Sequence, residues 1–512
     1  MAKTLRLILG DQLNLQHSWF KNTDKHHVYL MMEVMQEQEY VKHHIQKIIG
    51  FFLAMRSFAE ELEKAGHEVI YLKLDDAKNL QSFEKNIQQI IKEIGAEKLE
   101  YQLPDEYRLD EQLKKICSAL PIETSFVDTE HFFTERFDVR EFFKGKKQYL
   151  METFYRDMRK KHHVLVDERL EPFGDKWNFD HDNRKKYDGK VPLKGPLQFK
   201  KDVTQLIDLI DKMKVGYFGK IDARSFTYPT NRAEALKVLE YFCEELLPAF
   251  GRYEDAMLKE HHTLFHSQLS FALNLKMLSP HEVLKKVLTT WGSRKSEINI
   301  AQVEGFVRQV IGWREYIRGI YWDQMPAFAD KNFLNNKTDL PSWFWDGKVK
   351  MNCMKYCINN SLENAYAHHI QRLMVIGNFA LLIGADPKQV DEWYLGVYID
   401  AVEWVQITNT RGMSQFADGG LIGSKPYVAS ANYINKMSNY CKGCYYDKDK
   451  RYGEKACPFN SLYWNFYLQH QNKLKKNPRI GMMYRLVEKM DKTEITAILK
   501  QADIYLSQLN TL

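Results

Sequence analysis

The sequence lacks several features that would place the protein in special classes. No apolar run is long enough to cross a bilayer, which excludes a membrane-spanning helix. The N-terminus, MAKTLRLILGDQL, carries charges inside its apolar stretch and has no small-residue cleavage site, so it does not fit a signal peptide. The chain contains no G-x-G-x-x-G pattern, internal repeat or low-complexity tract, so a standard dinucleotide site is not expected. We expect a cytoplasmic monomer with no membrane partner.

Cysteine is scarce, with 7 in 512 residues. In a reducing compartment these are not expected to form a disulfide framework, so clustered cysteines indicate a metal site or catalysis. Cys441 and Cys444 form a C-x-x-C turn, Cys457 is followed by proline, and Cys353 and Cys357 lie one helical turn apart upstream. Either upstream cysteine could supply a fourth ligand. Zinc accepts such a set, but the cysteine–proline pair favours an iron–sulfur cluster.

The composition is that of an ordinary globular protein with more than one domain. Hydrophobic residues make up 44% and charged residues 27%, and 512 residues are too many for one ordinary core. The formal charge of +6 indicates only a mild preference for anionic partners. Aromatic residues are frequent at 13%, which mainly reflects core packing but also suits stacking on a flat cofactor or on bases.

The first 130 residues alternate between apolar runs and helical patterns. The runs predict strands, and patterns at 40–64 and 80–94 predict helices, the first closed by Gly66. Such alternation indicates a parallel sheet that binds ligands at the carboxyl ends of its strands, where Asp11 and Gln12 lie. The predicted strands are residues 5–9, 28–34, 69–74, 98–102 and 122–127.

Beyond this region the pattern changes twice. Periodicity weakens over 134–205, and residues 176–190 read as a long exposed loop. After 205 almost every segment has helical periodicity. We therefore predict an α/β domain over 1–133, an interdomain linker over 134–205 and an all-α domain over 206–512.

Several long motifs, in order along the chain, carry a resemblance to a known family. With the cysteine spacing, they are similar to the iron–sulfur bacterial cryptochromes and photolyases, the prokaryotic (6-4) photolyases. The resemblance covers nearly the whole chain, from residue 7 to about residue 468. The motifs are LILGDQL (7–13), GFVRQVIGWREYIRG (305–319), NAYAHHIQRLM (364–374), YIDAVEWV (398–405), GMSQFADGG (412–420) and SKPY (424–427).

The resemblance implies an N-terminal antenna domain, a helical domain that holds FAD, and a [4Fe-4S] cluster. The cluster ligands carry over to Cys353, Cys441, Cys444 and Cys457, which leaves Cys357 as a neighbour. The implied antenna chromophore is 6,7-dimethyl-8-ribityllumazine. It maps to Gly10, Asp11, Gln12, Glu37, Tyr40 and Phe51, the last of which replaces a smaller aliphatic residue of a relative.

The FAD contacts implied by the resemblance are polar groups near helix starts, where hydroxyls and backbone N–H groups bind phosphate well. Taken alone, Ser267 or Ser270 could equally be a helix cap, and Arg314 could be a structural ion pair. Gln406 maps to the position that faces flavin N5, where a relative carries Glu. The full set is Tyr253, Asp255, His266, Ser267, Leu269, Ser270, Arg314, Arg372, Asp400 and Gln406.

His369, with His368 beside it, is the candidate catalytic acid, because repair of a (6-4) lesion requires proton transfer and histidine titrates near neutral pH. A capping box at 360–363 predicts the start of their helix. Tyr427 is expected to line the lesion pocket. The resemblance also implies an electron path through Trp393, Tyr394 and Trp345, although core packing alone would account for these residues.

Contacts to damaged DNA are expected from the linker, where positive charge and an aromatic ring occur together at Trp177, Arg184, Lys185 and Lys186. The resemblance implies a DNA-repair lyase in which excited reduced FAD donates an electron to a flipped (6-4) pyrimidine–pyrimidone photoproduct. One alternative is a blue-light photoreceptor, a cryptochrome with the same cofactors and no repair. Another is an iron–sulfur nucleic-acid-binding module without photochemistry, which does not account for the α/β domain.

Overall fold

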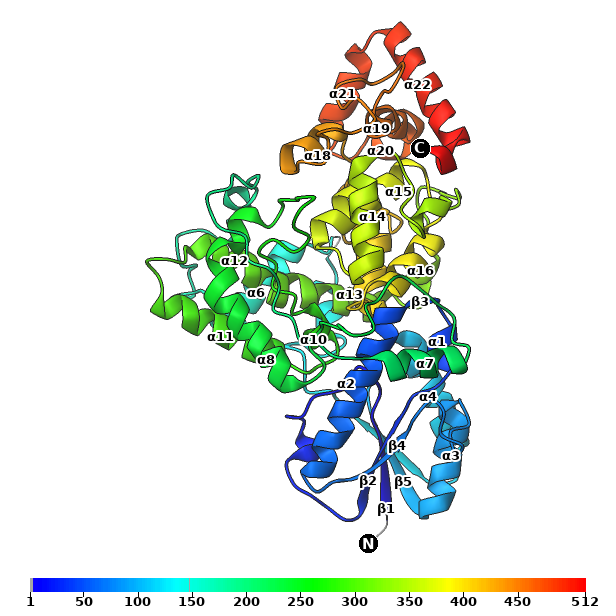
Figure 1. Cartoon of the computed structure of the whole chain (residues 1–512). Helices are drawn as coiled ribbons and strands as arrows, with labels where there is room; N and C mark the ends of the chain where they lie inside the picture. The colour runs from blue at the N-terminus through cyan, green and yellow to red at the C-terminus, as the bar shows by residue number, and fades with distance from the viewer. Residues whose placement is uncertain (1–2, 147) are drawn as a thin grey trace.

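The computed structural model describes residues 3–146 and 148–512. A parallel sheet forms one end of the molecule, helices build the middle, and the C-terminal helices lie at the end opposite the sheet (Figure 1). The strand order is β4-β2-β1-β5-β6, and each neighbouring pair is parallel. The strands are β1 Lys3–Leu7, β2 His27–Met32, β4 Glu68–Leu72, β5 Ala96–Gln102 and β6 Glu123–Val127.

Alternating side chains of each strand face two different layers. Val28 and Leu30 join a core with helices α3 (Phe83–Ile94) and α4 (Tyr107–Ala119). Tyr29 and Met31 face the opposite side, where α2 packs and the core continues into the helical part. The five predicted strands are therefore present, each with ends within a few residues of the observed ones, and the sheet is parallel as predicted.

Helix α2 spans Ile45–Lys64 and begins five residues later than predicted. His44 is extended, and its Nδ1 accepts a hydrogen bond from the backbone N–H of Gln46, which fixes the start of the helix. Before it lie α1 (Gln36–Glu39) and β3 (His43–His44), which pairs in parallel with β7 (Tyr217–Phe218). At the other end Gly66 adopts φ +91°, as a glycine after a helix should.

The region predicted as a linker contains more regular structure than its sequence suggests. Helices α5 (Asp138–Phe143) and α6 (Met151–Lys161) precede an irregular stretch with one short turn of helix at Asp180–Asn183. The stretch from 176 to 190 is otherwise irregular, and most of its side chains are exposed.

Beyond the linker, the regular elements other than β7 are helices, joined by irregular loops. Four π-helical segments interrupt the helical part of the chain, a feature often found at functional sites. They are Phe242–Leu246, Arg308–Arg314, Gln371–Gly377 and Thr408–Ser414. The helices are α7 Thr204–Lys212, α8 Arg232–Tyr241, α9 Leu247–Phe250, α10 Ser270–Asn274, α11 Pro280–Ser293, α12 Ile300–Val307, α13 Glu315–Gln324, α14 Asn352–Asn364, α15 Asn378–Leu382, α16 Pro387–Val397, α17 Glu403–Ile407, α18 Ala431–Met437, α19 Pro458–Gln469, α20 Gln471–Leu474, α21 Gly481–Lys489 and α22 Lys492–Ser507.

The predicted helix start at 360–363 is wrong. These residues form the last turn of α14, which ends because Ala365 turns into the left-handed region at φ 48°. The next helix starts at His369. The backbone N–H of His368, just before it, donates to the side chain of Gln371 at 3.2 Å, so the Gln371 side chain caps the start of this helix. His368 therefore lies at a break between two helices.

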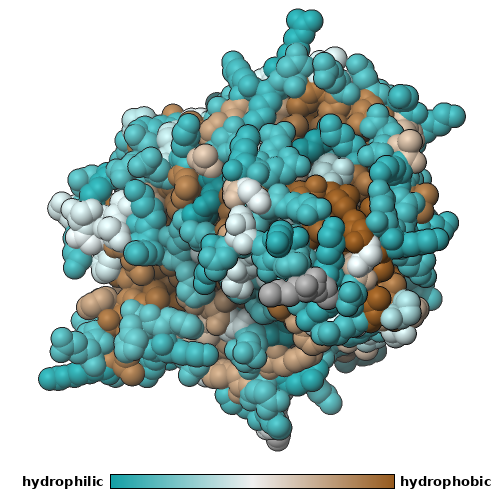
Figure 2. Space-filling view, turned by 90° about the horizontal axis from the view of Figure 1, so that it is seen from below, coloured by the Kyte–Doolittle hydropathy of each residue, from teal (hydrophilic) through white to brown (hydrophobic). Residues whose placement is uncertain are grey.

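Viewed from the sheet end, the surface is mainly hydrophilic, with apolar residues gathered in separate patches (Figure 2). None of the helices in the described ranges is long and apolar enough to cross a membrane.

Candidate functional site

Four cysteines line one cavity of about 330 Å³ near the C-terminal end of the molecule. Cys353 comes from the first turn of α14, Cys441 and Cys444 from the loop after α18, and Cys457 from the N-cap of α19. Aromatic and aliphatic side chains, including Tyr440, Tyr446 and Phe459, complete the wall. The sequence-predicted ligand set is thus brought together.

The spacing of these thiols bears on what they could hold. Within residues 3–146 and 148–512, no three His, Cys, Asp or Glu side chains lie close enough to hold a single metal ion. Burial and the neighbouring thiols raise the pKa of Cys353 well above its usual value, and that of Cys457 is raised to about 12. These groups would lose their protons only to a strongly bound cation.

A buried ion pair joins two of the residues predicted to hold FAD. Arg372, in a π-helical segment, lies 3.0 Å from Asp400, which follows α16. The hydroxyl of Ser270 donates to the same carboxylate at 2.6 Å, and Asn274 donates to the backbone oxygen of Asp400 at 2.6 Å. These contacts fix the direction of the carboxylate.

A cavity of about 620 Å³, which includes its open mouth, is lined by His266 and Ser267, two of the residues predicted to contact FAD. Tyr228 and Gln268, which sequence reasoning missed, also face it. Gln268 sits at φ 55°, an uncommon backbone conformation for a residue other than glycine. Its neighbour Leu269 is buried in the hydrophobic core, so its side chain is a packing group rather than a polar contact.

The remaining predicted FAD residues lie elsewhere. The Tyr253 hydroxyl donates to Asp188 of the linker at 2.6 Å, and Asp255 accepts from Tyr433 at 3.3 Å. Arg314 donates to Leu273 and Asn274 and lies 4.8 Å from the centre of the Trp404 ring, so protein groups already engage its guanidinium. Gln406 is buried in α17. The structure therefore groups Ser270, Arg372 and Asp400 and keeps Tyr253 and Asp255 at the linker.

Histidines gather next to the ion pair. The rings of His266 and His368 stack with centroids 4.6 Å apart and planes 13° apart. His368 is 2% exposed, and neither of its ring nitrogens has a hydrogen-bond partner in the described part of the chain. A buried imidazole in this state gains stability when a ligand or water supplies a partner.

His369 differs from its neighbour because its side chain is exposed to solvent, although many protein atoms surround it. Burial, then the charge of Arg372, lowers the pKa of His369 to about 4. The ring is consequently neutral at pH 7 until negative charge comes close to it.

A chain of aromatic rings connects the surface to the Arg372–Asp400 pair. Trp345, 45% exposed, lies 6.4 Å from Phe344, which lies 5.2 Å from Trp393. The Trp393 ring is 5.2 Å from Tyr394 and 5.9 Å from Tyr398. The three predicted residues are brought together, and two members, Phe344 and Tyr398, were missed.

The inner end of this chain contacts the ion pair. The guanidinium of Arg372 lies 3.8 Å from the centre of the Tyr398 ring, and the Tyr394 hydroxyl donates to the Arg372 backbone oxygen at 2.7 Å. Adjacent polar and aromatic residues thus run without a gap from solvent to Asp400.

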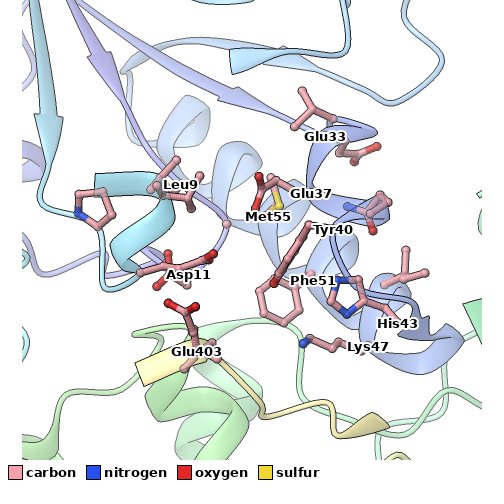
Figure 3. A pocket seen from close by; sticks show the side chains of 18 of the residues that line it. Leu9, Asp11, Glu33, Glu37, Tyr40, His43, Lys47, Phe51, Met55 and Glu403 are labelled. Carbon is pink, nitrogen blue, oxygen red and sulfur yellow. The ribbon is translucent and has the colours of Figure 1, made fainter. Parts of the chain in front are cut away.

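A third cavity, of about 900 Å³ including its open mouth, lies at the carboxyl ends of β1, β2 and β5. Gly10, Asp11, Glu37, Tyr40 and Phe51 line it as predicted. Figure 3 shows Asp11 and Glu403 pointing toward one another across it from the two parts of the chain, with the rings of Tyr40 and Phe51 beside them. This is where ligands bind in open parallel sheets.

Gln12 does not line this cavity. Its side chain is fully buried, accepts from the backbone N–H of Leu9 at 2.9 Å and donates to the backbone oxygen of Gln102 at 3.1 Å. The residue fixes the loop after β1 against the end of β5. The sequence prediction of a direct ligand contact is wrong at this position, because these backbone groups use the amide.

The walls of the sheet-end cavity carry more carboxyl groups than cations. Burial and the charge of Glu403 raise the pKa of Glu106 to about 8, and burial lowers the pKa of Lys47 to about 7. Arg108 lies behind the wall, bonded to Glu37 at 2.7 Å, with its guanidinium 4.2 Å from the centre of the Tyr40 ring. A neutral ligand with several hydroxyl groups suits such a cavity better than an anionic one.

The basic residues of the linker lie on the surface. Arg184, Lys185 and Lys186 are exposed, and Lys186 reaches the backbone oxygen of Asn435 on α18 at 3.4 Å. Trp177 is half-buried among Arg156, Arg159 and Lys160, 4.9 Å from the Arg159 guanidinium, so much of its ring already packs on the protein.

Two solved structures share this architecture. A cryptochrome from Synechocystis superposes with a TM-score of 0.55 at 13% identity, over 97% of this chain and 93% of that one. A bacterial class III photolyase from Agrobacterium tumefaciens gives a TM-score of 0.53 at 15% identity, over 85% and 86%. The fold is that of the photolyases and cryptochromes.

Sequence comparisons show which family within this class the chain belongs to. A family model described as deoxyribodipyrimidine photo-lyase-related protein matches residues 6–226. A (6-4) photolyase of Agrobacterium fabrum is 41% identical over 512 residues, which cover 99% of each chain. The chain belongs to the (6-4) photolyase family.

Proposed function

We propose that this protein is a lyase that uses light to repair (6-4) pyrimidine–pyrimidone photoproducts in DNA. The observation that carries the proposal is the 41% identity to a protein named a (6-4) photolyase, which extends over 99% of both chains. The arrangement of His368 and His369 beside the Arg372–Asp400 pair supports it, because it offers a proton-transfer group at an internal cleft.

FAD is proposed to bind between the Arg372–Asp400 pair and the cavity lined by His266 and Ser267. Ser270, Arg372 and Asp400 would face its ring system, with Gln406 near N5, and His266, Ser267 and Gln268 would contact its more polar part. The unpartnered nitrogens of His368 support a ligand in this space. When bound and reduced, FAD supplies an electron on illumination. Arg372 and Asp400 hold fixed charges around it, and the surrounding helices exclude water.

His369 is the proposed proton donor to the lesion. Its pKa of about 4 leaves the ring neutral at pH 7 in the free protein. A DNA phosphate brought into the cleft favours the charged form and raises this pKa toward the neutral range, where a general acid works best. We propose that His368 positions it from the adjacent helix break and that Tyr427 forms part of the wall of the lesion pocket.

The four-cysteine cavity is proposed to hold a [4Fe-4S] cluster with a structural role. Cys353 and Cys457 lie more than 100 residues apart in sequence, so a shared cluster would tie α14 to the C-terminal helices. The cysteine–proline pair at Cys457 and the membership in this family support a cluster over a single zinc ion.

The sheet-end cavity is proposed to hold a ribityllumazine antenna. Its carboxylate-rich wall suits a neutral polyol chain, and the rings of Tyr40 and Phe51 suit a flat chromophore. Phe51 lies 6.1 Å from Phe271, which follows Ser270 in α10, so the antenna and FAD sites share a wall. On this view, the antenna domain covers 1–133, the linker with DNA-contacting Trp177, Arg184, Lys185 and Lys186 covers 134–205, and the FAD domain covers 206–512.

The test is a repair assay with oligonucleotides that carry one (6-4) photoproduct or one cyclobutane dimer, in blue light and in darkness. We expect light-dependent loss of the (6-4) lesion. Flavin photoreduction without repair of either lesion would instead favour the photoreceptor function.

A further inference from the structure

A basic loop near the C-terminus lies at the edge of the proposed lesion cleft. The loop, residues 475–479, joins α20 to α21 and lies beyond the family motifs. Asn477 donates to the backbone oxygen of Ser424 at 3.0 Å, and its Oδ1 accepts from the backbone N–H of Arg479 at 2.9 Å. These two bonds fix the loop, and Arg479 with it, against the segment that carries Tyr427.

Two cations from distant parts of the chain influence the pKa of Tyr427. Burial raises its pKa, while Arg184 of the linker and Arg479 of the basic loop both act in the opposite direction. Lys186 reaches Asn435 on α18, and Tyr433 of the same helix bonds to Asp255. Residues 424–437 therefore lie between the linker on one side and the basic loop on the other.

Within the described residues, Arg184 of the linker has an acidic partner, whereas Lys185 of the linker and several cations on the other side have none. Arg184 is paired with Asp180, and Asp180 also lies 3.3 Å from Arg308. Across the described residues, the exposed side chains of Lys425, Lys476 and Arg479 form no ion pair or hydrogen bond, whereas Lys475 is bonded to Glu488 at 2.9 Å. Cations without partners attract phosphate without first giving up another interaction.

We infer that Lys425, Lys476 and Arg479 form a second phosphate-binding site, which holds the DNA backbone on the side of the cleft opposite the linker. The inference rests on the proposed function, since it takes damaged DNA as the ligand. A base that leaves the stack needs its strand held on both sides of the flipped nucleotide. One row of cations on the linker holds only one side.

The experiment compares the triple variant Lys425→Gln, Lys476→Gln, Arg479→Gln with wild type in binding to duplex DNA with and without a (6-4) lesion, over a series of salt concentrations. The matched control is Lys85→Gln, Lys92→Gln, Lys115→Gln, which removes the same charge from exposed positions on α3 and α4 at the sheet end of the molecule.

The dependence of log Kd on log salt should become shallower by about 2 to 3 in the test variant, close to one unit for each phosphate that the protein no longer neutralises. The control should retain the wild-type slope, and repair at saturating DNA should stay unchanged in both. Equal slopes for wild type and test variant would overturn the second site while leaving the repair function in place. Failure of the wild type to repair the lesion would overturn the proposed function itself.

Discussion

Cys353 and Cys357 lie one turn apart on α14, yet only Cys353 lines the cavity shared with Cys441, Cys444 and Cys457. Cys357 faces Tyr440 instead. The two residues are therefore a matched pair of buried thiols, of which one is a proposed ligand and the other is not.

We expect about four iron atoms per chain in protein purified without oxygen, as a cubane cluster requires. Cys353→Ser should lose most of the iron and much of its solubility, whereas Cys357→Ser should keep both. Metal analysis of the two variants measures this. One zinc per chain in wild type, or equal iron loss in the two variants, would contradict the cluster.

The aromatic chain predicts the route of light-driven flavin reduction. Trp393→Phe and Tyr398→Phe should each slow reduction of bound flavin by an external donor severalfold, because each removes a redox-active ring between Trp345 and Arg372. Trp291→Phe on α11, outside the chain, is the control. Absorbance during blue illumination gives the rate. Wild-type rates in both test variants would show that these two rings pack the core and do not carry electrons to the flavin.

The sheet-end cavity predicts selective loss of the antenna. Glu37→Ala should abolish the second chromophore's absorption and leave FAD in place, since Glu37 lines the cavity and holds Arg108 against Tyr40. Glu39→Ala, an exposed position on the same short helix, should bind both chromophores. Release of FAD by Glu37→Ala would mean that the two sites are interchanged.

We expect His44 to lower the free energy of unfolding of the protein in acid. Its Nδ1 accepts from Gln46, its Nε2 lies 2.9 Å from the Leu362 backbone oxygen, and burial lowers its pKa from 6.5 to about 4. Between these values the unfolded chain binds a proton that the folded chain does not, so stability falls as pH falls.

From pH 7 to pH 5 this residue should contribute a loss of about 2 kcal/mol in the free energy of unfolding. His44→Gln, whose amide can both donate and accept, should show a smaller loss, and the fully exposed His181→Gln should behave as wild type. Urea unfolding at the two pH values provides the comparison. Identical pH dependence in His44→Gln and wild type would exclude this role.

Local patterns predicted much of the fold. The five strands, the parallel sheet and the helix closed by Gly66 follow from alternation and from glycine chemistry, which act over a few residues. The start of α2 was misplaced because a histidine cap resembles no common capping signal. Residues 360–363 match a capping box, but α14 already runs through them, and only Ala365 ends it.

The site was less predictable where contacts join distant segments. The rarity and spacing of the thiols pointed to Cys441, Cys444 and Cys457 with either Cys353 or Cys357, and only the family resemblance selected Cys353. Tyr398 was missed because its contact with Arg372 joins two helices and leaves no local signal. Gln12 was assigned to the ligand because it follows a strand, yet neighbouring backbone groups engage its amide.

The central claim is that His369 supplies a proton during light-driven repair of a (6-4) lesion. The most direct measurement is the yield of repaired DNA after one light flash, for wild type and His369→Asn reconstituted with equal FAD. We expect repair by wild type and a decrease of roughly two to four orders of magnitude in the variant, with lesion binding little changed. Equal yields would contradict the account.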